Sequence, residues 1–245
     1  MTKTILITGG TGKVGAQLVN HFAGMGLNVL FTTRSKKNLE KLKSGRENVN
    51  GIIVNFFDEK ACETVEEYIN KKNYKVNYLV NNARDIETLS VEDNGHIKRE
   101  NFINEYIIDV VTPYELSFRL AQSGSLEKIV NISSMYAMVA LNPNLYEADY
   151  KPCIQYGCAK SALIMLTKNL ATMYREKGIK VNCVSYGGIE GRVDDAFKSR
   201  YAKLCPEGRM MKEEETIGAV DFLISDKSSY INGQNIIADG GWTIW

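Results

Sequence analysis

The sequence predicts an α/β fold in which helices cover both faces of a doubly wound parallel sheet of about seven strands. Two observations predict it: short apolar runs alternate with segments of helical periodicity, and a glycine-rich turn follows the first apolar run. This pattern is typical of a Rossmann-type sheet, whose ligand crevice lies at the carboxyl ends of the strands. The length suits one large domain, so we treat residues 1–245 as a single domain.

Seven apolar runs are expected to form strands. They span residues 3–9, 28–34, 51–56, 76–82, 128–134, 179–185 and 233–239. A first helix follows the glycine-rich turn and stops at Gly24 and Gly26, and further helices are expected over residues 36–44, 59–72, 101–121, 156–177 and 215–225. The polar stretch 186–215 is expected to be a substrate loop.

Composition excludes several classes of partner. The net charge is +1, with 30 basic and 29 acidic residues scattered along the chain, so nucleic acid and anionic membranes are not expected partners. Five cysteines without a CxxC pair and only two histidines predict no metal site. We find no signal peptide and no membrane-spanning run, and we expect a cytoplasmic protein with reduced thiols.

The stretch "TGGTGKVGAQLV", Thr8 to Val19, is the first candidate binding motif. A glycine triad between a strand and a helix lets backbone amides approach a pyrophosphate, and the helix N-terminus adds partial positive charge. No Gly-Lys-Ser/Thr follows, so a dinucleotide is favoured over ATP. The residues expected to contact it here are Gly9, Thr11, Gly12, Lys13, Val14 and Gly15.

The end of the second expected strand indicates which dinucleotide is bound. An acid here would accept hydrogen bonds from the ribose of NAD, but this chain has Thr33, followed by Arg34 and Ser35. A guanidinium can bind a 2′-phosphate with two hydrogen bonds, so the sequence favours NADP(H) over NAD(H).

Tyr156 and Lys160 are the candidate acid–base pair. They lie four residues apart in an expected helix, so their side chains share one face. An ammonium at about 4 Å favours the phenolate by roughly 4 kcal/mol at an effective dielectric of about 20, before desolvation. The preceding strand ends at Ser134, which should open at the same crevice and complete a candidate catalytic group.

Six ordered segments resemble the short-chain dehydrogenase/reductase family, in its compact single-domain form, over nearly the whole chain. They are "TGGTGKVG", "NNA", "IVNISS", "YGCAK", "KVNCVSYGG" and "INGQNIIADGGW". The resemblance implies that Tyr156 exchanges a proton with the substrate, that Lys160 assists it and holds the nicotinamide ribose, and that Ser134 polarises the substrate oxygen. It also implies an NADP(H)-dependent oxidoreductase acting on a carbonyl or alcohol, assembled as a homodimer or homotetramer.

The resemblance implies further cofactor contacts. Asn82 and Ala83 would support the cofactor loop, and the segment from Gly187 to Ile189 would line the nicotinamide. Asn55, followed by Phe56, stands where the family has an acid near the adenine.

Several positions depart from the family pattern. Asp109 replaces the asparagine that serves a proton-relay water, Arg84 replaces the glycine of "NNAG", and Tyr186 replaces the proline of a "PG" motif. About nine extra residues lie between Ser134 and Tyr156, and this insertion, around residues 141–152, is either a substrate-binding segment or a plain surface excursion.

Arg84 and Arg192 would suit a phosphate or carboxylate on the substrate, although a solvated charge explains each equally well. The insertion and "YGGIEGR" also resemble bacterial members of the family linked to flagellin glycosylation and nonulosonate sugars, which implies a sugar or sugar derivative as substrate. Two alternatives stay open. The glycine spacing is typical of an extended branch with sugar epimerases and dehydratases, and the departures above would also suit a catalytically retired nucleotide-binding protein.

Overall fold

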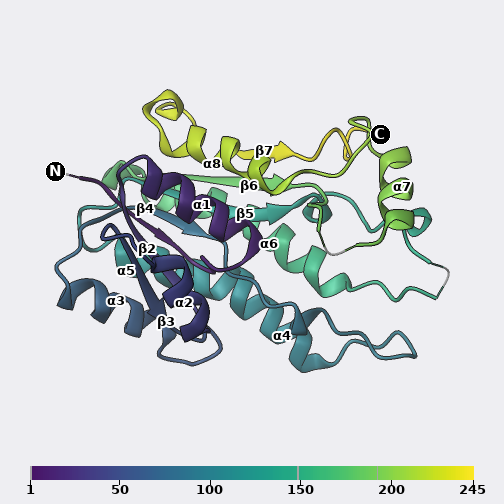
Figure 1. The fold of residues 1–245 in the computed structure, drawn as a ribbon, viewed down its shortest axis with the longest axis horizontal. Coiled ribbons are helices and arrows are strands. Elements are labelled where there is room, and N and C mark those ends of the chain that lie inside the picture. The colour runs from purple at the N-terminus through teal and green to yellow at the C-terminus, as the bar shows by residue number, and fades with distance from the viewer. Residues whose placement is uncertain (1, 148, 192) are drawn as a thin grey trace.

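Seven parallel strands form one sheet in the order β3-β2-β1-β4-β5-β6-β7 (Figure 1). The computed structural model describes residues 2–147, 149–191 and 193–245. The strands are β1 (Thr4–Ile7), β2 (Asn28–Thr33), β3 (Val49–Ile53), β4 (Val76–Asn81), β5 (Lys128–Ser134), β6 (Lys180–Tyr186) and β7 (Asn235–Ala238). All seven expected strands are present, in the doubly wound arrangement that the sequence predicts.

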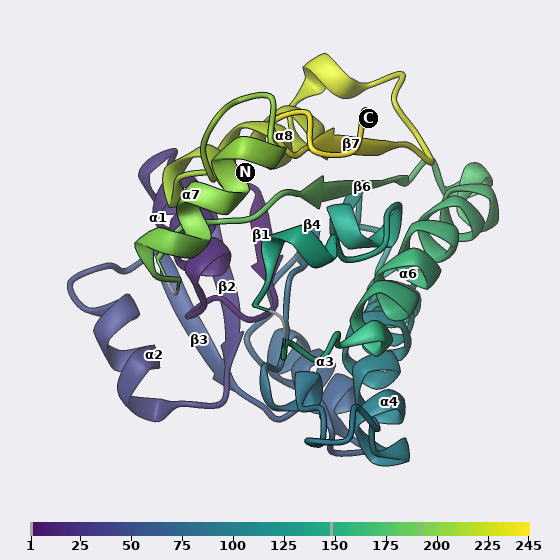
Figure 2. The ribbon, with the colours of Figure 1, turned by 90° about the vertical axis from the view of Figure 1, so that its right-hand side faces the viewer.

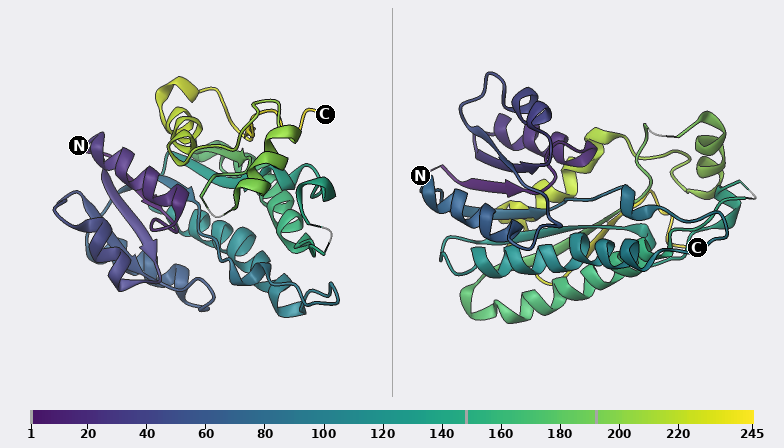
Figure 3. Two further views of the ribbon diagram at one scale, coloured as in Figure 1. Left: turned by 45° about the vertical axis from the view of Figure 1, so that its right-hand side comes forward. Right: turned by 90° about the horizontal axis from the view of Figure 1, so that it is seen from below.

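Helices cover both faces of the sheet, each over its own apolar core (Figure 3). On one face pack α1 (Lys13–Gly24), α2 (Lys36–Lys43) and α8 (Ile217–Ile224). On the other pack α3 (Ala61–Lys71), α5 (Thr112–Leu120) and α6 (Ile154–Met173), with α4 (Arg99–Tyr106) leading into α5. Residues Ile5 and Leu6, adjacent in β1, face opposite cores because side chains alternate along a strand.

The helix expected over residues 101–121 is interrupted. A π-helical turn, Ile107–Val111, joins α4 to α5 and contains Asp109. The extra residue of such a turn rotates the side chains that follow, and such turns are frequent at functional sites. Here it faces α6, which runs beside α4 and the π-helical turn (Figure 3).

The segment 186–215, which we expected to be a substrate loop, is partly helical. It contains helix α7 (Asp195–Leu204), which begins where the Asp194 carboxylate accepts a 2.7 Å hydrogen bond from the Phe197 amide. Tyr201 of this helix stacks on Trp242 with ring centroids 4.5 Å apart. Viewed towards the carboxyl ends of the strands, α7 lies at the rim of the sheet, opposite α4 (Figure 2).

The strand order places a crevice between β1 and β4. The chain turns towards β2 on one side of this pair and towards β5 on the other, so the connections diverge at the carboxyl ends. Within the described part of the chain, every helix is too short or too polar to cross a membrane.

Candidate active site

The glycine-rich turn after β1 is held from two sides. The Gly9 amide donates to Thr32 Oγ1 at 3.0 Å, and Asn82 Nδ2 donates to the Thr8 carbonyl at 2.9 Å. Gly9 has φ of +65°, which favours glycine, and a Cβ on Gly15 would collide with the Gly9 carbonyl and lie 2.8 Å from Gly10 Cα. The glycine spacing therefore reflects backbone crowding in a tight strand-to-helix turn.

The start of α1 is free to receive an anion. Gly12 precedes the helix without a side-chain cap, whereas Ser35 caps α2 through a 3.2 Å bond from the Asn38 amide. Uncapped amides carry partial positive charge at a helix N-terminus. Together with the crowded turn, this cradle fits the pyrophosphate of a dinucleotide.

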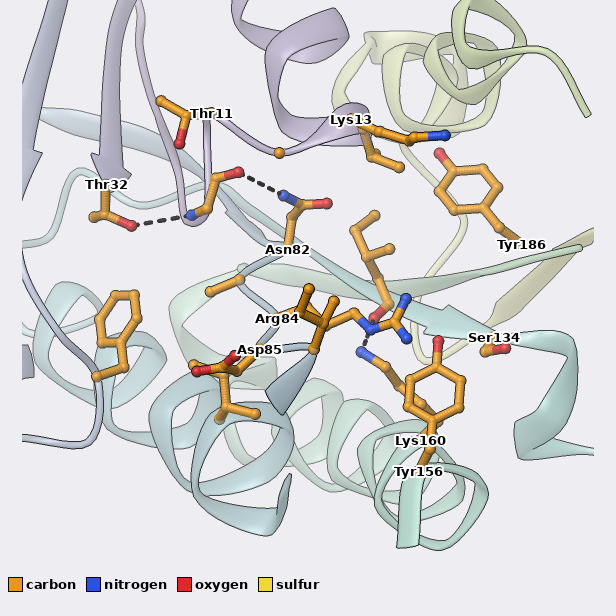
Figure 4. A pocket seen from close by; sticks show the side chains of 18 of the residues that line it. Thr11, Lys13, Thr32, Asn82, Arg84, Asp85, Ser134, Tyr156, Lys160 and Tyr186 are labelled. Atoms are coloured by element: carbon orange, nitrogen blue, oxygen red, sulfur yellow. Dashed lines mark hydrogen bonds between the residues drawn. The ribbon is translucent and has the colours of Figure 1, made fainter. Parts of the chain in front are cut away.

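One cavity of about 630 Å³ joins the cofactor and acid–base candidates. It runs from the glycine-rich turn to the start of α6, along the carboxyl ends of β1, β4 and β5 (Figure 4). Of the residues that we predicted from sequence, those lining it are Gly9, Thr11, Gly12, Lys13, Val14, Thr33, Arg34, Ser35, Asn55, Phe56, Asn82, Ala83, Ser134, Tyr156, Lys160, Gly187 and Ile189. Neither Gly15 nor Asp109 is among its lining residues.

Arg34, which we expected to bind a 2′-phosphate, is paired with a carboxylate in this structure. Its Nη1 lies 2.6 Å from Asp85 Oδ2, in the loop after β4, and the arginine side chain remains about half exposed at 54%. Thr33 Oγ1, at the position of the missing acid, lies 2.8 Å from Thr11 Oγ1. The only carboxylate paired with Arg34 among the described residues comes from a different element, 51 positions away.

Lys13 points away from the glycine-rich turn, towards the segment after β6. Its ammonium donates to the Glu190 carbonyl and lies 3.5 Å from Glu213 Oε1. The 186–215 segment is held further by a parallel bridge between Ile189 and Met211. Lys13 therefore joins this segment to α1.

Tyr156, Lys160 and Ser134 lie together at the other end of the cavity (Figure 4). Lys160 Nζ lies 5.8 Å from the centroid of the Tyr156 ring, and both side chains project from the first turns of α6. Ser134 Oγ accepts a 3.2 Å bond from the Tyr136 amide, which leaves its own hydrogen for a ligand. The four-residue spacing of Tyr156 and Lys160 produces the proximity that we expected.

Asp109 forms a buried ion pair with Lys160. Its Oδ1 accepts from Lys160 Nζ at 2.8 Å, and the same ammonium donates to the Ile132 carbonyl at 2.9 Å. Burial lowers the pKa of Lys160, but the Asp109 carboxylate and Tyr156 together raise it by more, so the ammonium persists. Asp109 thus contacts Lys160 directly, where the resemblance to the family implies an asparagine that serves a water.

Arg84 projects into the cavity towards Tyr156 and Lys160 (Figure 4). Its guanidinium carbon lies 4.7 Å from the centroid of the Tyr156 ring, within the range of a cation–π contact. Burial lowers the pKa of Arg84, and the nearby Tyr156, Asp109, Glu105 and Cys153 groups together raise it by more. Arg192, the other cation proposed for the substrate side, lies outside the described residues.

The insertion folds back against α7. Arg200 Nε donates to the Leu145 carbonyl at 2.8 Å, and Arg200 Nη1 lies 2.8 Å from Glu147 Oε1. The hydroxyls of Tyr146 and Tyr136 lie 2.9 Å apart, and Tyr136 lines the cavity. The described part of the insertion therefore contacts α7 and a residue that lines the cavity, Tyr136.

Sequence analysis missed several buried polar residues beside this site. They are Asp85, Thr88, Glu105 and Gln155. Their contacts join segments far apart in the chain, so the sequence does not show which residues meet. The one signal in the sequence that could have indicated a buried polar group was Glu105, which lies among apolar residues of the expected helix. No group of three or more histidine, cysteine, aspartate or glutamate side chains is arranged for a metal in the parts of the chain that are described.

Comparison with known proteins identifies the family of this chain. A family model described as enoyl-(acyl carrier protein) reductase matches residues 12–243. The 3-oxoacyl-(acyl-carrier-protein) reductase of Thermotoga maritima is 32% identical over 256 residues, which cover 99% of this chain and 98% of that protein. The chain belongs to the short-chain dehydrogenase/reductase family of oxidoreductases.

Solved structures share the fold over its full extent. A short-chain dehydrogenase from Leptospira borgpetersenii with bound NAD⁺ superposes with a TM-score of 0.88 at 26% identity, covering 99% of this chain and 93% of that one. A gluconate 5-dehydrogenase from Burkholderia cenocepacia, in complex with NADP and tartrate, has a TM-score of 0.85 at 22% identity, covering 99% and 96%. The first of these structures holds NAD⁺ and the second holds NADP.

Proposed function

We propose that the protein is an NADP(H)-dependent dehydrogenase/reductase that interconverts a carbonyl and an alcohol. The observation that carries the proposal is the grouping of Tyr156, Lys160 and Ser134 in the cavity that begins at the glycine-rich turn. The nicotinamide, when bound, supplies or accepts the hydride. The residues of the chain then have to hold the substrate oxygen and move one proton.

Each residue has a defined part in this proposal. Ser134 donates its free hydroxyl hydrogen to the substrate oxygen, and Tyr156 gives that oxygen a proton during reduction or removes one during oxidation. Lys160, fixed by Asp109 and the Ile132 carbonyl, stabilises the phenolate that forms on Tyr156. An acid and a cation placed so closely favour an active enzyme over a retired nucleotide-binding protein.

The cofactor preference rests on the end of β2. Thr33 offers no carboxylate to repel a 2′-phosphate, and Arg34, Ser35 and Asn38 line the cavity beside it. A phosphate would compete with Asp85 for the Arg34 guanidinium, and the dianion has the stronger attraction.

The substrate we propose is a small polar carbonyl compound, such as a keto sugar or sugar derivative. Arg84 places a guanidinium beside Tyr156, Tyr136 lines the same cavity, and the described part of the insertion adds the Tyr146 hydroxyl next to that of Tyr136. The test is a panel of keto sugars, sugar phosphates, simple ketones and a 3-oxoacyl thioester, followed by NADPH absorbance. Turnover limited to polar carbonyls would support the assignment, and turnover only of the thioester would contradict it. Isomerisation of a sugar with no net change in NADPH absorbance would instead favour an epimerase.

A further inference from the structure

Behind the Asp109–Lys160 pair lies a second buried carboxyl group, Glu105. It sits one helical turn before Asp109, is fully inaccessible to solvent, and takes no part in the proposed proton transfer. Thr88 and Gln155, both buried, close the space around it from the loop after β4 and from α6. A fully buried carboxylate is costly unless hydrogen bonds or cations compensate its charge.

This cluster has more acceptors than hydrogens. Within the described residues, Glu105 Oε1, Asp109 Oδ2 and Gln155 Oε1 have no hydrogen-bond partner. Gln155 Nε2 donates to the Thr88 carbonyl at 2.8 Å. Three buried oxygens that can only accept require at least one additional donor.

The Thr88 hydroxyl shows a second shortage of hydrogens, at the other carboxyl oxygen of Glu105. Thr88 Oγ1 lies 2.8 Å from the Asp85 carbonyl and is also in contact with Glu105 Oε2. A hydroxyl has one hydrogen, and a backbone carbonyl can only accept. If Thr88 donates to Asp85, its contact with Glu105 needs a hydrogen from the Glu105 carboxyl group.

We propose that Glu105 is held as the neutral acid, which leaves the Tyr156 hydroxyl beside two cations, Arg84 and Lys160, and a single anion, Asp109. Glu105 is then a positioning residue, because it acts on Tyr156 only through the charge of this cluster. The inference rests on the proposed function for its effect on turnover, while the protonation of Glu105 stands independently of it.

The charges that face Glu105 fit this assignment. Burial and the neighbouring Asp109 carboxylate raise the pKa of Glu105 to about 7, against the opposing effects of the Thr88 hydroxyl, Lys160 and Arg84. Ionisation of Glu105 releases one proton to solvent and adds a second anion to the cluster. That charge offsets one of the two cations and disfavours the Tyr156 phenolate, the form that removes a proton during alcohol oxidation.

The first test measures the proton on Glu105 and needs no substrate. At about pH 6 most carboxyl groups are ionised, so the infrared band of a protonated carboxyl should be present in the unmodified protein and absent in Glu105→Gln. The matched control is Glu100→Gln, an exposed residue on the same helix, which should keep the band. In Asp109→Asn the band should disappear at a lower pH than in the unmodified protein, because the neighbouring charge is gone. No band at pH 6, or the same band in Glu105→Gln, would overturn the inference.

The second test measures the consequence for turnover. Glutamine has the shape of the neutral acid but cannot ionise, so a merely structural role would leave the pH profile unchanged. We expect the ascending limb of the alcohol-oxidation profile, where activity rises with pH, to move to lower pH by about one unit in Glu105→Gln, with Glu100→Gln superimposing on the unmodified protein. Superimposed profiles of all three proteins would overturn the effect on Tyr156. If no carbonyl or alcohol is turned over at all, the proposed function fails while the infrared band still decides the state of Glu105.

Discussion

At the scale of single residues, the proposed preference for NADP(H) over NAD(H) depends on the Arg34–Asp85 pair. Arg34 is half exposed while Asp85 is buried, so the arginine is the partner that can turn towards a ligand. The positive charge of Arg34 also offsets the negative charge of Asp85, the carboxylate paired with it in the described structure. Removing either partner should therefore change NADPH and NADH binding unequally.

Arg34→Ala should weaken NADPH binding by about 10- to 100-fold, because a charge-assisted hydrogen bond contributes roughly 1.5–3 kcal/mol. NADH binding should change little. Asp85→Asn should have the opposite effect and strengthen NADPH binding, since it releases the guanidinium while keeping the side-chain oxygen that accepts from the Glu87 amide at 3.0 Å. Fluorescence titration of both cofactors checks this, and equal affinities in the unmodified protein would contradict the NADP(H) preference.

At the scale of elements, the turn between β1 and α1 tolerates no side chain at Gly15. Gly15→Ala should destabilise the fold by about 1–3 kcal/mol and weaken cofactor binding, because the new methyl group would force the backbone of Gly9 and Gly10 to move. Gly24→Ala, at the other end of α1, is the matched control. Its methyl group would have no atom within 4 Å, so it should stabilise the helix by up to about 1 kcal/mol. Thermal unfolding of both variants checks the contrast, and equal effects would be inconsistent with it.

The insertion depends on α7 for its position. Arg200→Ala removes the bond to the Leu145 carbonyl and the ion pair with Glu147. We propose that the insertion forms part of the substrate-binding side of the cavity and that these two contacts hold it in place. We therefore expect KM for the carbonyl substrate to rise several-fold, while the Kd of NADPH stays the same. Lys198→Ala on the same helix, which removes only the exposed pair with Asp195, is the control. An unchanged KM in Arg200→Ala would indicate that the insertion is a surface excursion.

Local signals predicted the strands, most helices and the assembly of Ser134, Tyr156 and Lys160, because each depends on periodicity or on a spacing of a few residues. Helix α7 was missed because its apolar stripe is sparse and charged residues surround it. The Arg34–Asp85 pair and the orientation of Lys13 could not be predicted, since their partners lie 51 and 177 or more positions away. Such contacts depend on how the strands are ordered in the sheet.

At the scale of the whole molecule, apolar side chains remain exposed along α5 and α6. They include Tyr114, Phe118, Met165 and Met173. The two helices belong to the same face of the sheet, over one apolar core. A broad apolar surface of this kind is typical of a contact between subunits.

We therefore expect a homodimer or homotetramer in solution. Phe118→Asp should shift the assembly towards monomers at micromolar concentration, because a buried unpaired charge at an interface is costly. Met25→Asp, at the exposed end of α1, should leave the assembly unchanged. Light scattering measures the mass of each variant, and a monomeric unmodified protein would contradict the expectation.

The central claim is that Tyr156 moves the proton in a reaction that depends on a nicotinamide dinucleotide. The most direct test compares Tyr156→Phe with the unmodified protein for NADPH affinity and for turnover of a carbonyl substrate. The account predicts unchanged affinity and a loss of kcat of about 10²- to 10⁴-fold, the usual contribution of a general acid or base. Turnover retained in Tyr156→Phe would contradict the account.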